Sequence, residues 1–444
     1  MASTLTDSET GPPTPEAPKK RRVGISVVVG SAVEWFDFYL YASMAALVFN
    51  KVFFPSENAM AGTMASVATF AVGFLARPVG GIFFGMLGDR LGRNRVLSLT
   101  FLLMGISSGC IGLLPGYSSI GILAPILLVV LRLLQGLGAG AEFGGAIALA
   151  YEHAEPGKRG RQGSWPALGV NIGLLASSLT VTVLTSMSDG FLYEYGWRIP
   201  FLLSFGLVGI GFWMRRRIPE TPEFEKAVRE ARLKRKRRKS PLVQLFRSDW
   251  RGLAVVMAIT AGYNGVSYIF KTFSLAYLTS FRDVEASVGS LGISIASFCA
   301  IITVPLAGRL ADRTGAKRLV IVGAVATGLL AFPFFWLLDT GNSWLIWLAL
   351  TLATGVVVPL MLSAQGAFLA KQFPTEVRSS GLGTGREVSG ALSGGLAPLA
   401  ALAIVQAAPG HASWGVSLLF VAGALFIGIG AACDQSKRYS DSLN

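Results

Sequence analysis

Several ionisable residues lie inside long apolar stretches of this sequence. A charge at the centre of a lipid bilayer costs about 2.5–3.5 kcal/mol on insertion scales, so each needs a partner, an aqueous cavity or a function. Glu34, Asp37 and Tyr41 are spaced i, i+3 and i+7, which places them on one face of a helix. Two carboxylates this close repel each other when both are ionised. The spacing predicts a proton acceptor at Glu34 or Asp37; the alternative is a structural salt bridge with an arginine of a neighbouring helix.

Further charges lie in the next apolar runs. Arg132 and Glu142 share one run and lie about 15 Å apart at 1.5 Å per residue, and Arg132 is the deeper of the two. Its planar guanidinium can bind a substrate carboxylate or hold Glu34 or Asp37. Arg77 lies about two turns from the end of its run, so it can also snorkel to the surface. Structural and coupling roles both stay open for these residues.

Composition indicates a membrane protein. Of the 444 residues 52% are hydrophobic and 14% charged, with a mean hydropathy of +0.56, which excludes an ordinary soluble chain. The net charge of +14 would suit nucleic-acid binding, but Lys and Arg cluster in alternate connections between apolar runs, as in membrane proteins. Cys110, Cys299 and Cys433 are far apart without metal-ligand spacing. We expect them to be packing residues and expect no metal site.

About twelve apolar runs are long enough to span a bilayer as helices. They cover 23–49, 60–84, 96–114, 120–151, 163–187 and 197–214 in the first half, and 252–280, 286–307, 319–338, 343–370, 381–406 and 413–432 in the second. One set of connections carries Arg90, Arg93, Arg95, Lys158, Arg159, Arg161, Arg309, Arg313, Lys317, Arg318, Lys371 and Arg378. The opposite set carries little more than Lys51 and Arg282. Both chain ends are therefore predicted to lie in the cytoplasm.

One short basic stretch occurs twice. Residues 85–97 read Gly-Met-Leu-Gly-Asp-Arg-Leu-Gly-Arg-Asn-Arg-Val-Leu, and residues 308–320 read Gly-Arg-Leu-Ala-Asp-Arg-Thr-Gly-Ala-Lys-Arg-Leu-Val. An offset of 223 (308 − 85) matches five positions, including Asp89 with Asp312. Each copy joins two apolar runs, so the sequence predicts one helical unit used twice.

The repeated stretch has the composition of a hinge-like turn. Its glycines permit a tight backbone, and its Asp can dock on a helix N-terminus or an Arg in one conformation only. A basic loop that only sets topology is the alternative. The predicted conformational gate is Gly85, Asp89, Arg90, Gly92, Arg93, Asp312 and Arg313.

These paired stretches resemble the signature loop of the major facilitator superfamily. Val-Glu-Trp-Phe-Asp-Phe-Tyr-Leu-Tyr at 33–41, Arg-Pro-Val-Gly-Gly at 77–81 and Gln-Gly-Leu-Gly-Ala-Gly-Ala-Glu-Phe-Gly-Gly-Ala at 135–146 resemble its metabolite:proton symporter branch. That branch carries shikimate, α-ketoglutarate, citrate, and proline or betaine. The resemblance implies that Arg132 and Glu142 belong to a shared framework. The glycines of the third motif match a dinucleotide fingerprint, but they follow no strand, so we interpret them as a helix-packing face.

The second half follows the resembled family in part. Tyr263, Asn264 and Tyr268 fit its aromatic, polar seventh span, whereas Lys271 and the pair Arg386-Glu387 depart from it. In this fold both departures lie on helices that face the central cavity. Two such cations favour an anionic substrate, one with two carboxylates being a candidate. Arg386 and Glu387 can instead pair with each other near the surface, and Lys271 can reach the outer interface.

Three more polar residues, Trp165, Asn171 and Gln365, are candidate hydrogen-bonding groups of the cavity, with helix–helix contact as the alternative. The predicted proton-coupling set is Glu34, Asp37 and Glu142. The predicted substrate-binding set is Tyr41, Arg77, Arg132, Trp165, Asn171, Tyr263, Asn264, Tyr268, Lys271, Gln365, Arg386 and Glu387.

The predicted domain organisation has five parts. A disordered cytoplasmic tail covers 1–22, a six-helix bundle 23–214, a basic linker 215–251, a second six-helix bundle 252–432 and a short tail 433–444. The linker holds Lys234-Arg235-Lys236-Arg237-Arg238-Lys239, which suits either anionic headgroups or nucleic acid, and its place between two bundles favours the lipid.

We therefore predict an all-α membrane protein of the plasma membrane that is not an enzyme. The predicted function is proton-coupled import of a small organic acid anion such as a di- or tricarboxylate or a shikimate-like acid. Zwitterion uptake, export by proton antiport, and a membrane-anchored nucleic-acid or signalling protein are the alternatives. No phosphate-binding Gly-x-x-x-x-Gly-Lys-[Ser/Thr] occurs, so we expect a proton gradient and no cofactor to drive transport. The expected partners are the substrate, protons and the lipid bilayer, with no nucleic acid, and the expected state is a monomer.

Overall fold

The computed structural model describes residues 16–56, 59–155, 157–185, 187, 189–216, 241–375, 377–436 and 438. Within these ranges the regular structure is helical throughout. Most of the predicted linker and both chain ends lie outside the described residues. The predicted domain boundaries therefore remain predictions.

The first group of helices, here called the first bundle, comprises α1 (Glu16–Met44), α2 (Asn50–Val52), α3 (Ala59–Leu91), α4 (Arg93–Leu113), α5 (Tyr117–Ile120), α6 (Leu123–Glu152), α7 (Arg159–Gly163), α8 (Trp165–Thr185), α9 (Asp189–Phe191) and α10 (Arg198–Arg216). The second bundle comprises α13 (Trp250–Tyr268), α14 (Ser274–Phe281), α15 (Ala286–Thr314), α16 (Ala316–Leu330), α17 (Pro333–Leu338), α18 (Ser343–Leu350), α19 (Val358–Ala370), α20 (Arg378–Ala407) and α21 (Trp414–Ala432). Helix α12 (Pro241–Ser248) precedes it. π-Helical turns η1 (Ala45–Phe49), η2 (Leu192–Gly196), η3 (Ile269–Phe273) and η4 (Thr351–Val357) and the 3₁₀ turn η5 (Pro409–His411) connect several of these helices.

Eleven helices of the described chain are long and apolar enough to cross a membrane. The remaining predicted span, 319–338, is broken into α16 and α17 around Phe332, and each piece has fewer than 18 residues. Pro333 explains the break, because proline lacks the backbone N–H and disfavours helical geometry at the residue before it. Helix α1 begins at Glu16 and therefore includes the last residues of segment 1–22, which the sequence predicts to be disordered.

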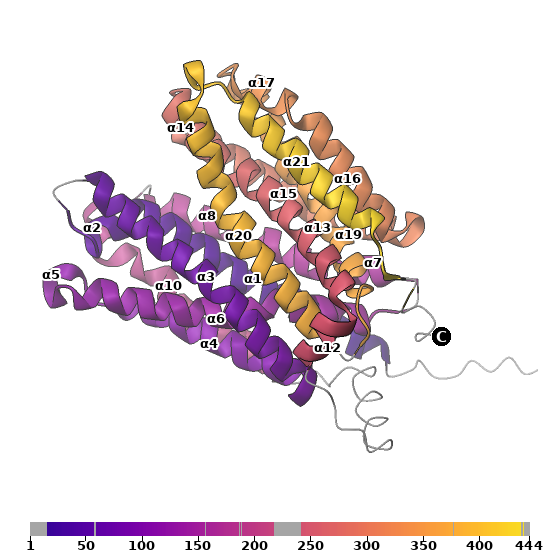
Figure 1. Ribbon diagram of the computed structural model, residues 1–444. Helices are drawn as coiled ribbons and strands as arrows, with labels where there is room; N and C mark the ends of the chain where they lie inside the picture. The colour runs from indigo at the N-terminus through magenta and orange to yellow at the C-terminus, as the bar shows by residue number, and fades with distance from the viewer. Residues whose placement is uncertain are drawn as a thin grey trace, which may run out of the picture.

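The bundles contact each other through a few helices. Helix α20 packs on α3 and α6, and α15 packs on α8 and α7. Figure 1 shows the bundles close together near α7, α12 and α19, with α2 and α5 at one far extremity and α14 and α17 at another. We call the end that carries Lys158, Arg161, Arg309, Lys317 and Arg378 the basic end, and the opposite one the far end.

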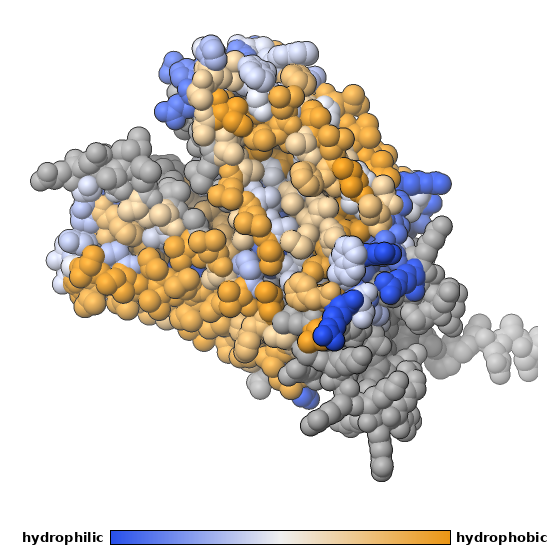
Figure 2. Space-filling model, in the orientation of Figure 1, coloured by the Kyte–Doolittle hydropathy of each residue, from blue (hydrophilic) through white to orange (hydrophobic). Residues whose placement is uncertain are grey.

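The sides of both bundles are apolar. Leu75, Val79 and Phe83 recur every four residues along α3 and are 56–66% exposed. Figure 2 shows hydrophobic residues covering the flanks, while hydrophilic ones gather beside the ends of the second bundle. An apolar flank between polar ends is the surface that a lipid bilayer requires.

The repeated basic stretch is more helical than the predicted turn. In the first copy α3 continues to Leu91 and α4 starts at Arg93, so only Gly92 interrupts the helix, with φ = 110°. In the second copy Gly315 does the same with φ = 93°. A positive φ of this kind favours glycine. The matching geometry explains why this position repeats.

Candidate functional site

The centre of the site is an ion-pair network at the junction of α1, α3 and α20. Arg77 Nη2 lies 3.1 Å from Glu34 Oε1, and Arg77 Nη1 lies 4.0 Å from Glu387 Oε2. Arg386 Nε lies 3.7 Å from Glu387 Oε1. All four side chains are at most 8% exposed, so ions in solution screen them little. Arg77 thus ties the two bundles together inside the protein.

Aromatic rings enclose the two arginines of this network. Arg77 Cζ lies 4.9 Å from the ring centroid of Phe38 and 5.4 Å from that of Phe74. Arg386 Cζ lies 3.8 Å from the centroid of Phe143. Cation–π contacts of this kind stabilise a desolvated guanidinium. No sequence pattern signals them, because a phenylalanine inside an apolar run resembles any packing residue.

Asp37 belongs to a separate network in the first bundle. Ser204 Oγ of α10 donates a hydrogen bond of 2.6 Å to Asp37 Oδ1. Arg132 Nη1 donates to Gln135 Oε1, and Gln135 Nε2 donates to Ser108 Oγ. Sequence reasoning missed both serines, because serine is common in membrane helices whatever its role. The network supplies polar partners to charges that would otherwise be isolated in an apolar bundle.

Of the two alternatives for Arg132, an ion pair with Glu34 or Asp37 is absent within the described residues, and a role in binding a substrate carboxylate stays a prediction. The Arg132 Cζ atom lies 4.0 Å from the ring centroid of Tyr41 instead. Arg77 is the partner of Glu34, which is the salt-bridge alternative raised above. The two carboxylates share a helix but contact different neighbours. Helical spacing defines a face, but not which neighbouring helix supplies the cation.

Lys271 stands apart from both networks. It lies in η3, a π-helical turn that contacts α20, and it is 9% exposed. It forms no hydrogen bond or ion pair with the residues that the structure describes. Nη1 of Arg386 is likewise without a hydrogen-bond partner in the described chain. Two buried donors of the second bundle are therefore available to a ligand. The burial of Lys271 also argues against a position at the outer interface.

The aromatic residues of α13 lie on a helix that packs against α20. Tyr263, Asn264 and Tyr268 are all buried, and the ring of Tyr268 packs 5.8 Å from that of Phe74 across the bundle interface. A Cβ atom on Gly390 of α20 would lie 2.9 Å from Asn264 Nδ2. Tyr268 therefore lies at the interface of the two bundles, and Asn264 faces α20 of its own bundle.

Four other predicted residues are more dispersed. Trp165 packs on Gly24 of α1, where a Cβ would lie 2.9 Å from the indole, so it supports a helix contact. Asn171 donates a 2.8 Å hydrogen bond from Nδ2 to the carbonyl of its own helix at Ala167. Gln365 is 2% exposed, and Glu142 is 1% exposed. Their predicted roles in transport stay predictions.

Polar contacts join the bundles at the basic end. Asp312 of α15 accepts hydrogen bonds from the backbone N–H groups of Gly160 and Arg161, the second at 2.9 Å. Arg378 Nη1 of α20 lies 2.6 Å from Glu152 Oε1 of α6, and both side chains are at most 2% exposed. The docking of an Asp on the start of a helix matches the geometry expected for the repeated stretch. Glu152 and Arg378 were missed as a pair, because nothing in their spacing connects residues 226 positions apart.

Of the remaining predicted gate residues, the structure describes the surroundings of Gly85, Gly92 and Arg313. Gly85 faces α20, and a Cβ there would lie 3.2 Å from Ser380 Cα; Gly92 is the helix break described above; Arg313 is exposed. The predicted side chains that lie outside the described part are those of Asp89, Arg90 and Arg93.

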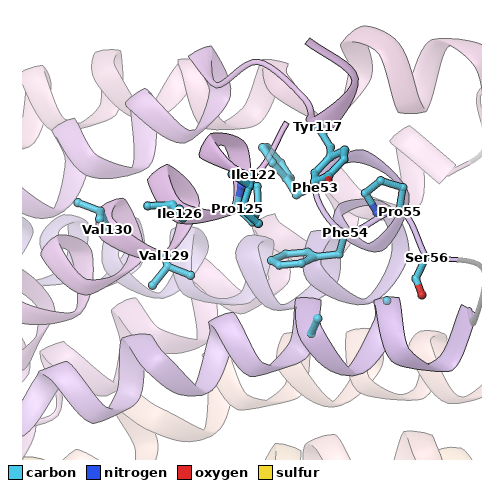
Figure 3. A pocket seen from close by; sticks show the side chains of 12 residues that line it. Phe53, Phe54, Pro55, Ser56, Tyr117, Ile122, Pro125, Ile126, Val129 and Val130 are labelled. Carbon is cyan, nitrogen blue, oxygen red and sulfur yellow. The ribbon is translucent and has the colours of Figure 1, made fainter. Parts of the chain in front are cut away.

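A pocket of about 500 Å³ lies away from this chemistry. It is bounded by Phe53 and Phe54, Tyr117, and Ile126 and other apolar residues of α6 (Figure 3). None of the predicted site residues line it. The candidate functional site is therefore the set of buried charged residues between the helices, and not this larger apolar pocket.

Comparison with known proteins identifies the family of this chain. The chain matches the profile of the Major Facilitator Superfamily over residues 27–398 and 273–433. It is 36% identical over 434 residues to the shikimate transporter of Escherichia coli K12, covering 96% of this chain and 97% of that one. It is 34% identical over 396 residues to the proline/betaine transporter of the same organism, covering 87% and 78%.

The fold also matches solved structures. The proton:xylose symporter XylE bound to 6-bromo-6-deoxy-D-glucose aligns with a TM-score of 0.76 and 16% identity, covering 94% of this chain and 95% of that one. These relatives and structural neighbours are transporters and not enzymes, as the sequence predicts. The recognition of the family from the motifs is confirmed. The chain is a multi-pass membrane transporter that belongs to the Major Facilitator Superfamily.

Proposed function

We propose that this transporter is a proton-coupled symporter that imports a small organic acid anion. The observation that carries the proposal is the balance of buried charge away from the basic end. Among the described residues four acids and four bases lie buried within the spans: Glu34, Asp37, Glu142 and Glu387, and Arg77, Arg132, Lys271 and Arg386. With all eight ionised their charges cancel. Protonation of one acid leaves one excess positive charge, which an anion neutralises.

This balance links the two ligands. A bound proton makes the interior favourable for an anion, and by thermodynamic reciprocity a bound anion makes it favourable for a proton. Lys271 and Arg386 are the donors offered to the anion, because each has capacity that no described residue uses. The resemblance to a shikimate transporter supports an acid as substrate.

The proposed orientation follows the positive-inside rule, with the basic end in the cytoplasm. The contacts of Asp312 with α7 and of Arg378 with Glu152 then hold the cytoplasmic side closed, and the far end is the entry side. Proton and substrate enter from outside, and the basic-end contacts break as the bundles rock about the site. With one proton taken up per negative charge, the loaded transporter carries no added net charge, so in this proposal the inward pH gradient drives uptake. Entry of proton and substrate from the far end is the order of steps that we propose.

The test is substrate-induced proton flux in proteoliposomes with an internal pH dye. The panel holds mono-, di- and tricarboxylates, shikimate-like acids and betaines. Acidification of the lumen on addition of one acid, absent in Glu34→Gln, supports the proposal. If no compound of the panel acidifies the lumen and none shows counterflow exchange, the proposal is contradicted. Export of another compound is then the better account.

A second candidate is zwitterion uptake. The pairing of Arg386 with Glu387 offers an adjacent cation and anion to the two ends of a zwitterion, and a proline/betaine transporter is among the relatives. In that case betaine alone acidifies the lumen, and Lys271→Ala leaves substrate affinity intact.

A further inference from the structure

The two charged networks of the first bundle approach each other around Phe38. Arg77 Cζ lies 4.9 Å from the Phe38 ring centroid and Arg132 Cζ lies 5.5 Å from it. Arg77 holds Glu34, and Arg132 holds Gln135. The same aromatic ring therefore contacts the arginine of each network.

A small cavity opens onto both networks. It has a volume of about 10 Å³, and its walls include Glu34, Arg77, Arg132 and Gln135 from α1, α3 and α6. A site of about this volume with two to four polar partners holds one water molecule. An apolar cavity of this size would stay dry, but this one has four polar side chains in its wall.

Two residues that line this cavity each have a buried atom with no hydrogen-bond partner in the described chain: Glu34 Oε2 and Arg132 Nε. The two residues are 1% and 2% exposed. Buried polar atoms are almost always paired with protein or with ordered water. The absence of a side chain at Gly73 lets the guanidinium of Arg132 pack against α3, because a Cβ there would lie 2.9 Å from Arg132 Cζ. One atom is an acceptor and the other a donor, so a single molecule can satisfy both.

We propose that this cavity is a binding site for one water molecule that bridges Arg132 Nε and Glu34 Oε2. The water accepts a hydrogen bond from the guanidinium N–H of Arg132 and donates one to the carboxylate of Glu34. When Glu34 is protonated, its hydroxyl donates to the water, and the water turns one hydrogen toward Gln135. The site therefore gives Arg132 Nε and Glu34 Oε2 a hydrogen-bond partner in both protonation states. The water would join the hydrogen bonds of Glu34 to those of Arg132. Its role in proton coupling rests on the proposed function.

The functional test fills the cavity without touching a charged residue. Ala139 lines the cavity and is buried, and Ala139→Val places methyl groups where the water lies. Ala139→Thr has the same shape but carries a hydroxyl that can replace part of the hydrogen bonding. Ala146→Val is the matched control, because Ala146 is equally buried on α6 but does not line the cavity. Each variant is measured for substrate-induced proton flux and for substrate counterflow.

We expect Ala139→Val to lower proton flux at least 10-fold relative to counterflow, Ala139→Thr to lower it less, and Ala146→Val to leave the ratio unchanged. An unchanged ratio in Ala139→Val overturns the coupling role, and so does an equal drop in all three variants. The site itself is tested on the full chain by an experimental structure that resolves ordered waters. Water density within hydrogen-bond distance of both atoms confirms the site. An empty cavity, or protein atoms that pair directly with Glu34 Oε2 and Arg132 Nε, overturns it. This measurement stands even if the parent protein shows no proton flux, which would refute the proposed function alone.

Discussion

The first and second bundles hold buried charge in different ways. In the first bundle Glu34, Asp37, Arg77 and Arg132 each have a hydrogen-bond or ion-pair partner from α1, α3, α6 or α10, and Arg77 also contacts Glu387 of α20. In the second bundle Lys271 has none among the described residues, and Arg386 uses only part of its guanidinium. A charge held by its own bundle is suited to proton handling, whereas a cation without a partner is suited to an exchangeable anion.

The sharpest way to break this comparison is to neutralise the first bundle's carboxylates. Glu34→Gln and Asp37→Asn keep the size of each side chain, and the amide oxygen introduced by Asp37→Asn can still accept from Ser204. We expect each variant, at normal expression, to lose proton-driven accumulation while counterflow continues. Uptake assays with and without an imposed pH gradient measure both. If both variants accumulate substrate like the parent, the coupling assignment to the first bundle is wrong.

The next effect concerns the contact that holds the bundles together at the basic end. Glu152→Gln removes the carboxylate that pairs with Arg378 Nη1, and breaking a buried pair of this kind costs about 3–5 kcal/mol. We expect the basic end to open. A cysteine at the buried Ser164 should then react with a water-soluble maleimide on the order of 100-fold faster.

The control for this opening is the double variant Glu152→Gln with Arg378→Gln. It removes both charges and leaves neither one buried alone. Labelling in the double variant should return most of the way to the parent rate. A labelling rate that stays at the parent value in the single variant would show that this ion pair does not hold the closed state.

Part of this arrangement follows from the sequence. Charges in apolar runs identify Glu34, Asp37, Arg77 and Arg132 as unusual, because lipid penalises unpaired charge whatever the fold. Which arginine meets which carboxylate depends on the rotation of neighbouring helices, and one helix's periodicity carries no information about it. Arg77 rather than Arg132 therefore holds Glu34.

The fold, too, is only partly predictable from the sequence. Apolar length and basic connections predict the spans, but the break before Pro333 divides one span, and Gly92 reduces an expected turn to one residue. The contact of Glu152 with Arg378 needs the two bundles to be docked. Its geometry is a property of tertiary structure, which local pattern cannot supply.

A smaller effect is expected at Lys271, which has no ion-pair partner among the residues that the structure describes. Lys271→Ala should raise the KM for an acid anion by about 10- to 100-fold, since a hydrogen bond to a charged group contributes about 1.5–3 kcal/mol. Lys271→Arg should recover part of the affinity because it keeps the charge. Initial-rate uptake measures both. An unchanged KM in Lys271→Ala would favour the zwitterion candidate and give Lys271 a structural role.

The smallest effect concerns the segment after α21. Partial burial raises the pKa of Asp434, but hydrogen bonds from Gln372 and Ser436 and the charge of Lys317 outweigh it, so its pKa is lowered. A lowered pKa contributes stability above the ordinary value of about 4, and that stability is lost as pH falls through the folded-state pKa.

Asp434→Asn should therefore lower stability at neutral pH by less than about 1 kcal/mol, because the contact is partly solvated. In acid, below the folded-state pKa, the variant and the parent should melt alike. Thermal unfolding in detergent across this range measures the difference. A difference that grows as the pH falls would contradict the assignment.

The most direct test of the central claim is calorimetry of anion binding to the purified transporter in buffers of different ionisation enthalpy. This measures the number of protons taken up per anion bound. The balance of buried charge predicts uptake of about one proton per negative charge at neutral pH, and little uptake in Glu34→Gln or Asp37→Asn. Anion binding with no proton uptake in the parent would contradict the account.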